Sequence, residues 1–134
     1  MPTEMPNATK QQLLDLLLAL GTLRMRALDS THGYVSGTDS KLSHINSGSF
    51  LGDEEVLTSV TTTDGFLRVD PASITSVLSL EFVDALVVYV WTGVDSTSPI
   101  VVFVDTNADN TDMNREGVTG ETITAYPPDY ILHL

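Results

Sequence analysis

The stretch from Phe82 to Asp105, FVDALVVYVWTGVDSTSPIVVFVD, decides the fold class of this chain. Two runs rich in Val, Leu, Ile, Tyr and Trp flank a short segment rich in Gly, Asp, Ser, Thr and Pro. Such a pattern is typical of two antiparallel core strands and their connection. We therefore predict strands at about Phe82–Trp91 and Ile100–Val104, within a protein built on a buried β-sheet.

Shorter strand patterns lie on both sides of this stretch. Residues 22–28 alternate between apolar and polar side chains, as a half-buried strand does, and Asp64-Gly65 is a strong hairpin turn. Further strands are predicted at Val56–Thr63, Phe66–Val69, Ile74–Leu80, Glu121–Ala125 and Tyr130–Leu134. Seven or so short strands at regular spacing predict a mainly β protein, an antiparallel β-sandwich or jelly-roll-like barrel with one short N-terminal helix.

The helix is predicted from Lys10 to Leu20. Thr9 is a suitable N-cap, Gln12 completes a capping-box pattern, and Gly21 can end the helix in the left-handed conformation. The leucines of this helix cover more than one stripe, so it cannot face water on most sides. Two interpretations stay open: a helix packed on its own sheet, or an interface helix shared with another subunit.

The chain divides most simply into two segments. Residues 1–21 form an N-terminal arm and helix, and residues 22–134 form the β-sandwich domain. Residues 29–53 are a long polar segment, and a loop of this length is usually functional or partly disordered.

Composition excludes several classes of protein. The 134 residues carry 18 acidic and 6 basic side chains, a formal net charge of −12. Such a chain is a poor partner for a nucleic-acid backbone or an anionic membrane, which both need Lys and Arg. There is no Cys for a disulfide or a thiolate site, the N-terminus is a poor secretory signal, and no uninterrupted apolar run is long enough to span a membrane.

Four groups of residues could carry chemistry, and none has a strong signature. The segment from Asp105 to Glu116 has oxygen ligands at calcium-loop positions 1, 3, 5, 7 and 12, but lacks the turn Gly, so we predict no tight calcium binding. His32 and His44 are not at metal-ligand spacing. Residues 53–55 (Asp-Glu-Glu) could form a paired-acid site but favour a solvated loop. Trp91 favours a rim or core position over a sugar platform.

From Leu23 onward, the order of segments resembles a family of small structural proteins of tailed bacteriophages, often uncharacterised virion proteins. The segments that carry the resemblance are TLRMRALDST, SHINSGSF, TDGFLRVDPASITSV, VDALVVYVWTGVDSTSPIVVFVDT and ETITAYPPDYILHL. They cover most of the chain but contain no catalytic motif. The Arg24/Arg26 pair and the acidic 105–116 loop depart from the family pattern.

The resemblance implies a capsid decoration, or cement, protein that bridges and stabilises neighbouring capsid subunits. A tail or head–tail connector component is the alternative within virions, and a calcium- or carbohydrate-binding β module is the alternative of another class. We expect no enzymatic activity, and no catalytic, cofactor-binding or metal residues. Expected partners are the major capsid protein and further copies of the chain in a homo-oligomer, without nucleic acid or membrane. The expected location is the virion, assembled in the host cytoplasm.

Overall fold

The computed structural model describes residues 4–70 and 81–105 with their side chains, and the backbone of strands at 72–77, 115–116, 121–125 and 132–133. The described elements are α1 (Asn7–Leu18), β1 (Thr22–Leu28), β2 (Phe50–Val56), β3 (Thr61–Thr63), β4 (Phe66–Arg68), β5 (Ala72–Val77), β6 (Phe82–Val83), β7 (Ala85–Trp91), β8 (Ile100–Val104), β9 (Arg115–Glu116), β10 (Glu121–Ala125) and β11 (Leu132–His133). Short 3-10 helices lie in the connections between strands: η1 (Leu42–His44) and η2 (Ser47–Ser49) between β1 and β2, and η3 (Asp95–Thr97) between β7 and β8.

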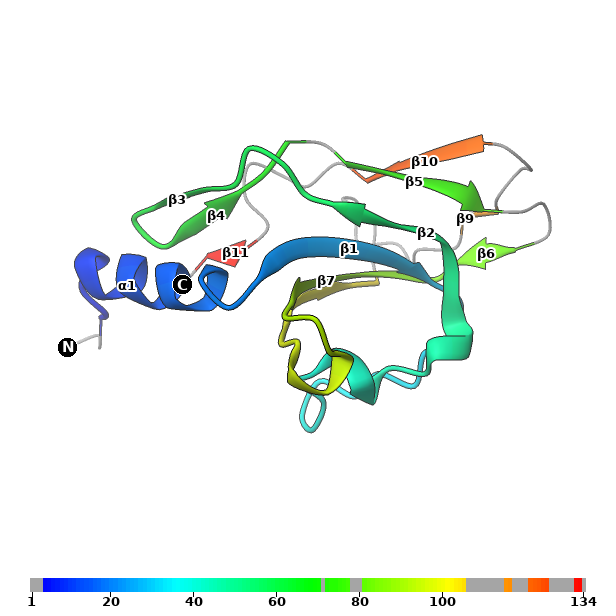
Figure 1. The fold of residues 1–134 in the computed structure, drawn as a ribbon, viewed down its shortest axis with the longest axis horizontal. Helices are drawn as coiled ribbons and strands as arrows, with labels where there is room; N and C mark the ends of the chain where they lie inside the picture. Colours follow the sequence, from blue (N-terminus) through cyan, green and yellow to red (C-terminus); the bar gives the residue numbers. More distant parts are fainter. Residues whose placement is uncertain are drawn as a thin grey trace.

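The central sheet is antiparallel, with the strand order β2-β1-β7-β8 (Figure 1). β1 and β7 pair along their whole length, from Thr22 opposite Trp91 to Leu28 opposite Ala85. All of β7 except Trp91 is buried. A continuous apolar run is typical of a strand covered on both faces, and β7 shows this because apolar clusters lie on each side of the sheet.

Two apolar clusters cover the two faces of the central sheet. The first joins α1, the β3–β4 hairpin and β6 to the sheet, through Leu14, Leu23, Met25, Ala27, Leu51, Leu57, Leu67, Val83, Leu86, Val88 and Val90. The second places the loop before β2 against the opposite face, through Leu28, Leu42, Ile45, Ala85, Val87 and Tyr89. Burying a side chain of this size contributes about 1.5–3 kcal/mol each, so these clusters hold the fold together.

Smaller sheets surround the central one. Asp64 and Gly65 both take positive φ angles and join β3 to β4, which confirms the predicted hairpin turn. β4 also pairs with β11, β5 pairs with β10, and β6 pairs with β9. β5 lies alongside β2 (Figure 1). The described strands form no closed barrel, and the mainly β, antiparallel fold class with one short N-terminal helix is confirmed.

The predicted start and end of the helix are wrong. α1 begins at Asn7 with Pro6 as its N-cap, and Thr9 lies inside the first turn, where its backbone N–H donates to the Pro6 carbonyl over 3.0 Å. Pro6 suits this place because its extended conformation (φ −58°, ψ 145°) is natural for proline. At the other end, Ala19 closes the helix in a right-handed conformation rather than Gly21 in a left-handed one.

Gly21 is required for a different reason. A Cβ atom at this position would lie 2.6 Å from the carbonyl carbon of Trp91, and nearer still to its oxygen. Backbone atoms cannot yield to such a contact, so Gly21 allows the α1–β1 junction to touch the end of β7.

Two further predicted boundaries are wrong: those of the strand at Val56–Thr63, and the end of the long polar segment at residue 53. The structure ends β2 at Val56, begins β3 at Thr61, and places Asp53 and the two glutamates after it in β2 rather than in a loop. Charged residues are poor strand formers in isolation, but pairing with β1 overrides that preference. Gly52 has a φ of 64°, and the pairing register shifts beside it, so a β-bulge allows this strand to form.

Residues 29–49 form an ordered loop on the second face of the sheet. Leu42 and Ile45 are buried in the second cluster, and the Leu42 N–H donates to the Ser98 carbonyl over 2.9 Å. Each end of the loop is tied as well, since the Asp29 N–H donates to Ser49 and the Asn46 N–H to His32, both over 2.9 Å.

Candidate functional site

α1 lies at one end of the long axis of the molecule and is anchored on one side only (Figure 1). Leu14 is 1% exposed and belongs to the first cluster, with Leu17 and Leu18 packed around it. The Gln11 side chain donates to the Thr62 hydroxyl, which in turn donates to Asp15 over 3.2 Å. The β3–β4 hairpin therefore holds one face of α1, which packs on its own domain. The other face has no partner among the described residues, and an interface with another subunit stays a prediction.

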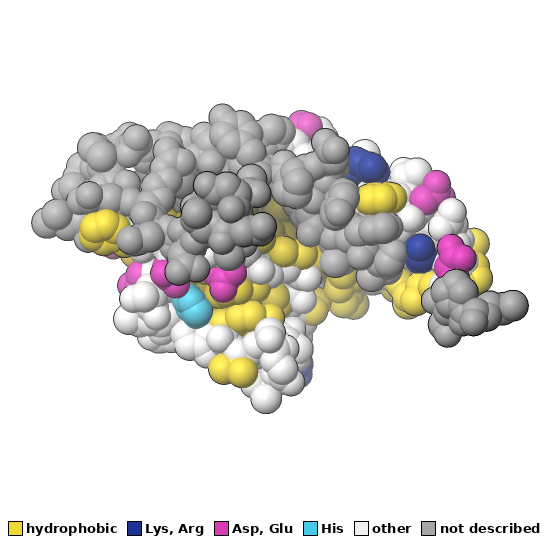
Figure 2. Space-filling view, turned by 180° about the vertical axis from the view of Figure 1, so that it is seen from behind, with side chains coloured by type: hydrophobic (Ala, Val, Ile, Leu, Met, Phe, Trp, Pro, Cys, Tyr) yellow, Lys and Arg dark blue, Asp and Glu magenta, His cyan; other side chains and the backbone are white. Residues whose placement is uncertain are grey.

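Two leucines on the outer face of α1, and a third in the turn that directly follows the helix, are exposed to solvent. The exposed fractions are 44% for Leu13, 67% for Leu16 and 56% for Leu20. We call these three residues the leucine stripe. Their spacing of three and four residues places them in one line along the helix. Figure 2 shows apolar side chains exposed at this end of the molecule.

The second feature is an ion cluster on the central sheet. The Arg24 guanidinium donates a hydrogen bond to one carboxylate oxygen of Glu54, and the Tyr89 hydroxyl donates a hydrogen bond to the other. The Nε of Arg26 lies 4.0 Å from this second oxygen. Aromatic rings flank the arginines: Arg24 lies 5.7 Å from the ring centre of Trp91, and Arg26 lies 4.6 Å from that of Phe50. The alternation of residues 22–28 predicts both arginines on one strand face, but it does not identify their partner, Glu54.

The ion cluster shifts two pKa values in opposite directions. Burial alone raises the pKa of Glu54, but the hydrogen bonds from Tyr89 and Arg24 and the charges of Arg24 and Arg26 outweigh it, so the pKa is lowered. Burial, followed by the hydrogen bond to Glu54 and its negative charge, raises the pKa of Tyr89 well above its usual value. The cluster therefore holds an ionised carboxylate and a neutral phenol, an arrangement that stabilises the sheet.

A shallow depression of about 360 Å³ lies beside the loop, lined by His32, Tyr34, Ser36, Phe103 and Asp105. Both ring nitrogens of His32 are engaged: Nδ1 accepts the Tyr34 N–H over 3.0 Å, and Nε2 lies 3.3 Å from an Asp84 oxygen. A general base needs an available ring nitrogen within reach of its nucleophile. His32 has none to offer Ser36, so this Ser, His and Asp do not form a catalytic triad.

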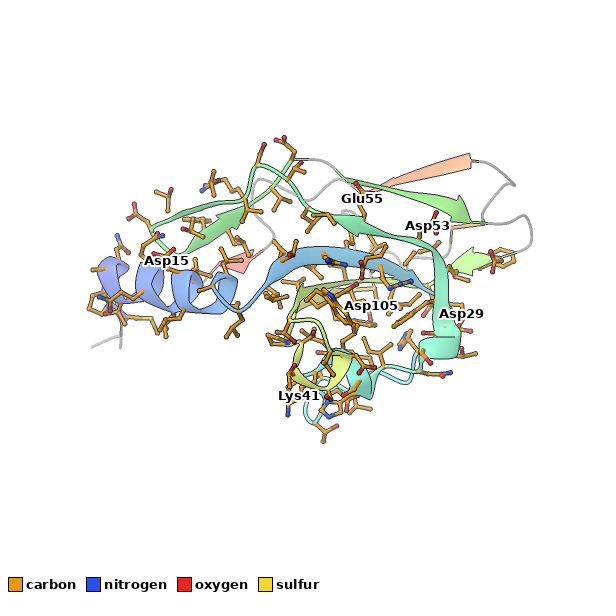
Figure 3. All side chains as sticks on the ribbon, in the orientation of Figure 1. Asp15, Asp29, Lys41, Asp53, Glu55 and Asp105 are labelled. Atoms are coloured by element: carbon orange, nitrogen blue, oxygen red, sulfur yellow. The ribbon has the colours of Figure 1, made fainter. Side chains whose placement is uncertain are left out.

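The other candidates from the sequence are placed apart from one another. The Nδ1 of His44 accepts backbone N–H groups of Ser40 and Lys41, over 3.1 and 3.3 Å. Glu54 faces Arg24, while Asp53 and Glu55 alternate with it along β2 and share the other side of the strand (Figure 3). The solvated-loop interpretation of residues 53–55 is therefore wrong, and the paired-acid interpretation stays a prediction.

Trp91 is half-buried at the end of β7, beside Arg24. In the 105–116 segment, side chains after Asp105 lie outside the described residues, so the calcium prediction stays a prediction.

The described residues contain neither a cluster of metal ligands nor a helix that could span a membrane. No group of three His, Asp or Glu side chains there could hold a metal ion. None of the helices described is sufficiently long and apolar to cross a membrane. No family model matches the chain, and no curated protein matches it. The leucine stripe is the described surface feature that bears most directly on function.

Proposed function

We propose that this chain is a structural virion protein, a capsid decoration (cement) protein that bridges and stabilises neighbouring capsid subunits, and that it has no enzymatic activity. The leucine stripe is the observation that carries the proposal. A contiguous apolar surface on a soluble domain is typical of a protein–protein contact. The β body supports the proposal because it presents this surface at one end of the molecule, anchored through Leu14.

The size of the stripe indicates how such a protein would act. A stable protein–protein contact usually buries 1,200–2,000 Å² in total, and three leucine side chains supply a small part of that area. Further surfaces must take part, and the outer side of the 29–49 loop, with Val35 56% exposed, is a second candidate. Several modest contacts that bind the same shell together gain affinity through multivalency, as bridging of neighbouring capsid subunits requires.

The direct test is sedimentation of the purified protein with empty capsids of the phage that encodes it. We expect the protein to pellet with the capsids, to saturate at many copies per particle, and to raise the temperature at which the capsids fall apart. Saturation at a few copies per particle would instead favour the tail or head–tail connector. Absence from the pellet, together with unchanged capsid stability, would contradict a virion role on the shell.

Three of the described aromatic rings are poorly placed for a carbohydrate module, although Phe82 is 45% exposed. Tyr34 and Phe103 stack on each other with ring centres 4.1 Å apart, and Arg24 lies over Trp91. Sugar-binding platforms need an open ring face, which these contacts cover. A calcium module is tested separately by the melting temperature, which calcium would raise and a chelator would lower if the 105–116 segment bound the ion.

A further inference from the structure

We propose that the leucine stripe of α1 is covered by the leucine stripe of a second copy of this chain, in an antiparallel contact between the two helices. This inference rests on the proposed function and deepens it: the stripe joins neighbouring copies of the decoration protein, and the shell is then bound through other surfaces, such as the outer side of the 29–49 loop with its exposed Val35. It depends on the spacing of the stripe, on the charges around it, and on the position of α1 in the molecule.

The spacing of the stripe indicates a helical partner. With Thr9 included, the exposed positions Thr9, Leu13, Leu16 and Leu20 follow at intervals of four, three and four residues. A repeat of this kind is the a/d seam of two packed helices, in which side chains of one helix fill spaces between side chains of the other. The inner face of the same helix uses other positions, Leu14, Leu17 and Leu18, to reach the body, so the seam is not part of the packing of the domain on itself.

The charges around the stripe favour a second copy as that partner. Lys10 and Leu17 flank the seam on one side and Gln12 and Ala19 on the other, so no acid borders it. The acid of α1, Asp15, accepts a hydrogen bond from Thr62 on the body side of the helix. Lys10 and Asp15 cancel, so α1 has no formal net charge although the whole chain has −12. It is a surface on which two copies can meet without opposing carboxylates.

The position of α1 favours the antiparallel direction. The helix projects from one end of the molecule, with the sheet and its loops beyond its C-terminal end (Figure 1). Two parallel helices would bring both acidic bodies to the same end, where they repel each other. Two antiparallel helices place the bodies at opposite ends and oppose the two helix dipoles. The contact is then two-fold symmetric, as most homodimer contacts are.

Self-association is tested with sedimentation velocity of the full chain over a wide concentration range. We expect a reversible dimer, with a weak affinity because the contact is small. Leu16→Glu places two carboxylates in the contact and should weaken the dimer about 100-fold or more. Val94→Glu is the matched control, because Val94 is 53% exposed and lies on the loop between β7 and β8, and it should leave the dimer unchanged. Melting curves of both variants should match the wild type, since neither residue is buried.

A mixing experiment separates self-pairing from a general effect of the new charge. Leu16→Glu and Leu16→Lys chains should each be monomeric alone, and should form a mixed dimer when combined, because the opposite charges meet across the contact. Because the chain has no Cys, the direction is tested with single introduced cysteines. In an antiparallel pair centred between Leu13 and Leu16, Thr9→Cys residues are separated by about 16 Å along the helix axis and should not cross-link, whereas Leu16→Cys residues should.

The outcomes distinguish this inference from the proposed function. A wild-type protein that stays monomeric at high concentration, or a dimer unaffected by Leu16→Glu, would overturn the pairing. If the monomeric wild type still binds capsids and Leu16→Glu abolishes that binding, the shell covers the stripe and the decoration role survives. Efficient cross-linking through Thr9→Cys would overturn the antiparallel arrangement.

Discussion

Replacing Glu54 by Gln tests whether the ion cluster stabilises the central sheet. Gln keeps an oxygen that can accept the hydrogen bond from Tyr89, but it removes the negative charge beside two arginines. A hydrogen bond to a charged group contributes about 1.5–3 kcal/mol, against 0.5–1.5 for a neutral one. The Arg24 and Glu54 side chains are 25% and 21% exposed, so solvent screens their ion pair and its loss adds about 1 kcal/mol or less.

The expected total loss is about 2 kcal/mol of unfolding free energy. For a domain of this size, 1 kcal/mol corresponds to a change in melting temperature of about 3–5 °C, so Glu54→Gln should melt about 6–10 °C below the wild type at neutral pH. Glu55→Gln is the matched control, since it removes the same charge from the next residue of β2, which alternates to the other side of the strand. Equal melting temperatures for the two variants would refute the reasoning.

The same variant has a defined pH dependence. A carboxyl group whose pKa is lowered in the folded state stabilises the protein above its unfolded pKa, and this contribution is lost as the pH falls through the lowered value. The gap between the wild type and Glu54→Gln should therefore be full at neutral pH and shrink in acid, below about pH 4.5. A gap that persists unchanged at about pH 2 would show that it does not come from the charge of Glu54.

Three further changes test the core and the helix junction. Because the pKa of Tyr89 is raised, the unfolding free energy of the wild type should fall above about pH 10, where the phenol ionises in the unfolded chain but not in the folded one. Tyr89→Phe should lack this loss of stability, which urea unfolding at a series of pH values would measure. In the same assay, Leu14→Ala should lower the unfolding free energy by about 2–5 kcal/mol, whereas Leu16→Ala should change it by no more than about 0.5 kcal/mol. Equal losses for the two variants would contradict the assignment of Leu14 to the inner face of α1 and Leu16 to the outer face. Gly21→Ala should lower the melting temperature by the equivalent of about 1–3 kcal/mol, because its methyl group meets the Trp91 backbone, and an unchanged value would contradict that close contact.

The burial of Leu14 also affects how the N-terminal segment can be tested. Deleting residues 1–21 would remove a side chain that is 1% exposed in the first cluster. Such a truncation would open a cavity in the β body, so loss of binding could reflect loss of folding. Substitutions in the leucine stripe change the outer surface and leave the anchor in place.

The parts of the fold that sequence predicted well are those in which local pattern and tertiary context agree. The residue alternation in β1, the apolar run of β7 and the Asp64-Gly65 turn each satisfy both. The strand predicted at Phe82–Trp91 is divided, because β6 (Phe82–Val83) pairs with β9 and only β7 (Ala85–Trp91) joins the central sheet. β2 was missed because its sequence is rich in charge and contains Gly52, and only its pairing with β1 makes it a strand. The helix start was misplaced because a hydroxyl cap was preferred to Pro6, which supplies the required conformation without a side-chain hydrogen bond.

The candidate sites could be predicted only in part. The excess of leucine in α1 indicated that the helix is covered on more than one side, either by its own sheet or at an interface, but the sequence does not tell which leucines turn inward. That depends on Gln11 reaching Thr62 and on Leu14 reaching the sheet. The ion cluster joins residues 30 and 35 positions apart in the chain. Strand alternation predicts that the two arginines share a face, but no local pattern identifies an acid so distant in the chain as their partner.

The junction at Gly21 has a mechanical consequence. α1 continues after a short turn into β1, and β1 lies between β2 and β7, with which it pairs. A force that pulls α1 along the direction of β1 therefore acts in shear on the hydrogen bonds that join β1 to β2 and to β7, and all of these bonds are loaded at the same time. They would resist as a set, whereas a strand peeled from an edge yields one bond at a time. In this molecule, tension at the helix is carried into the centre of the sheet, and the seven pairs between β1 and β7 share it.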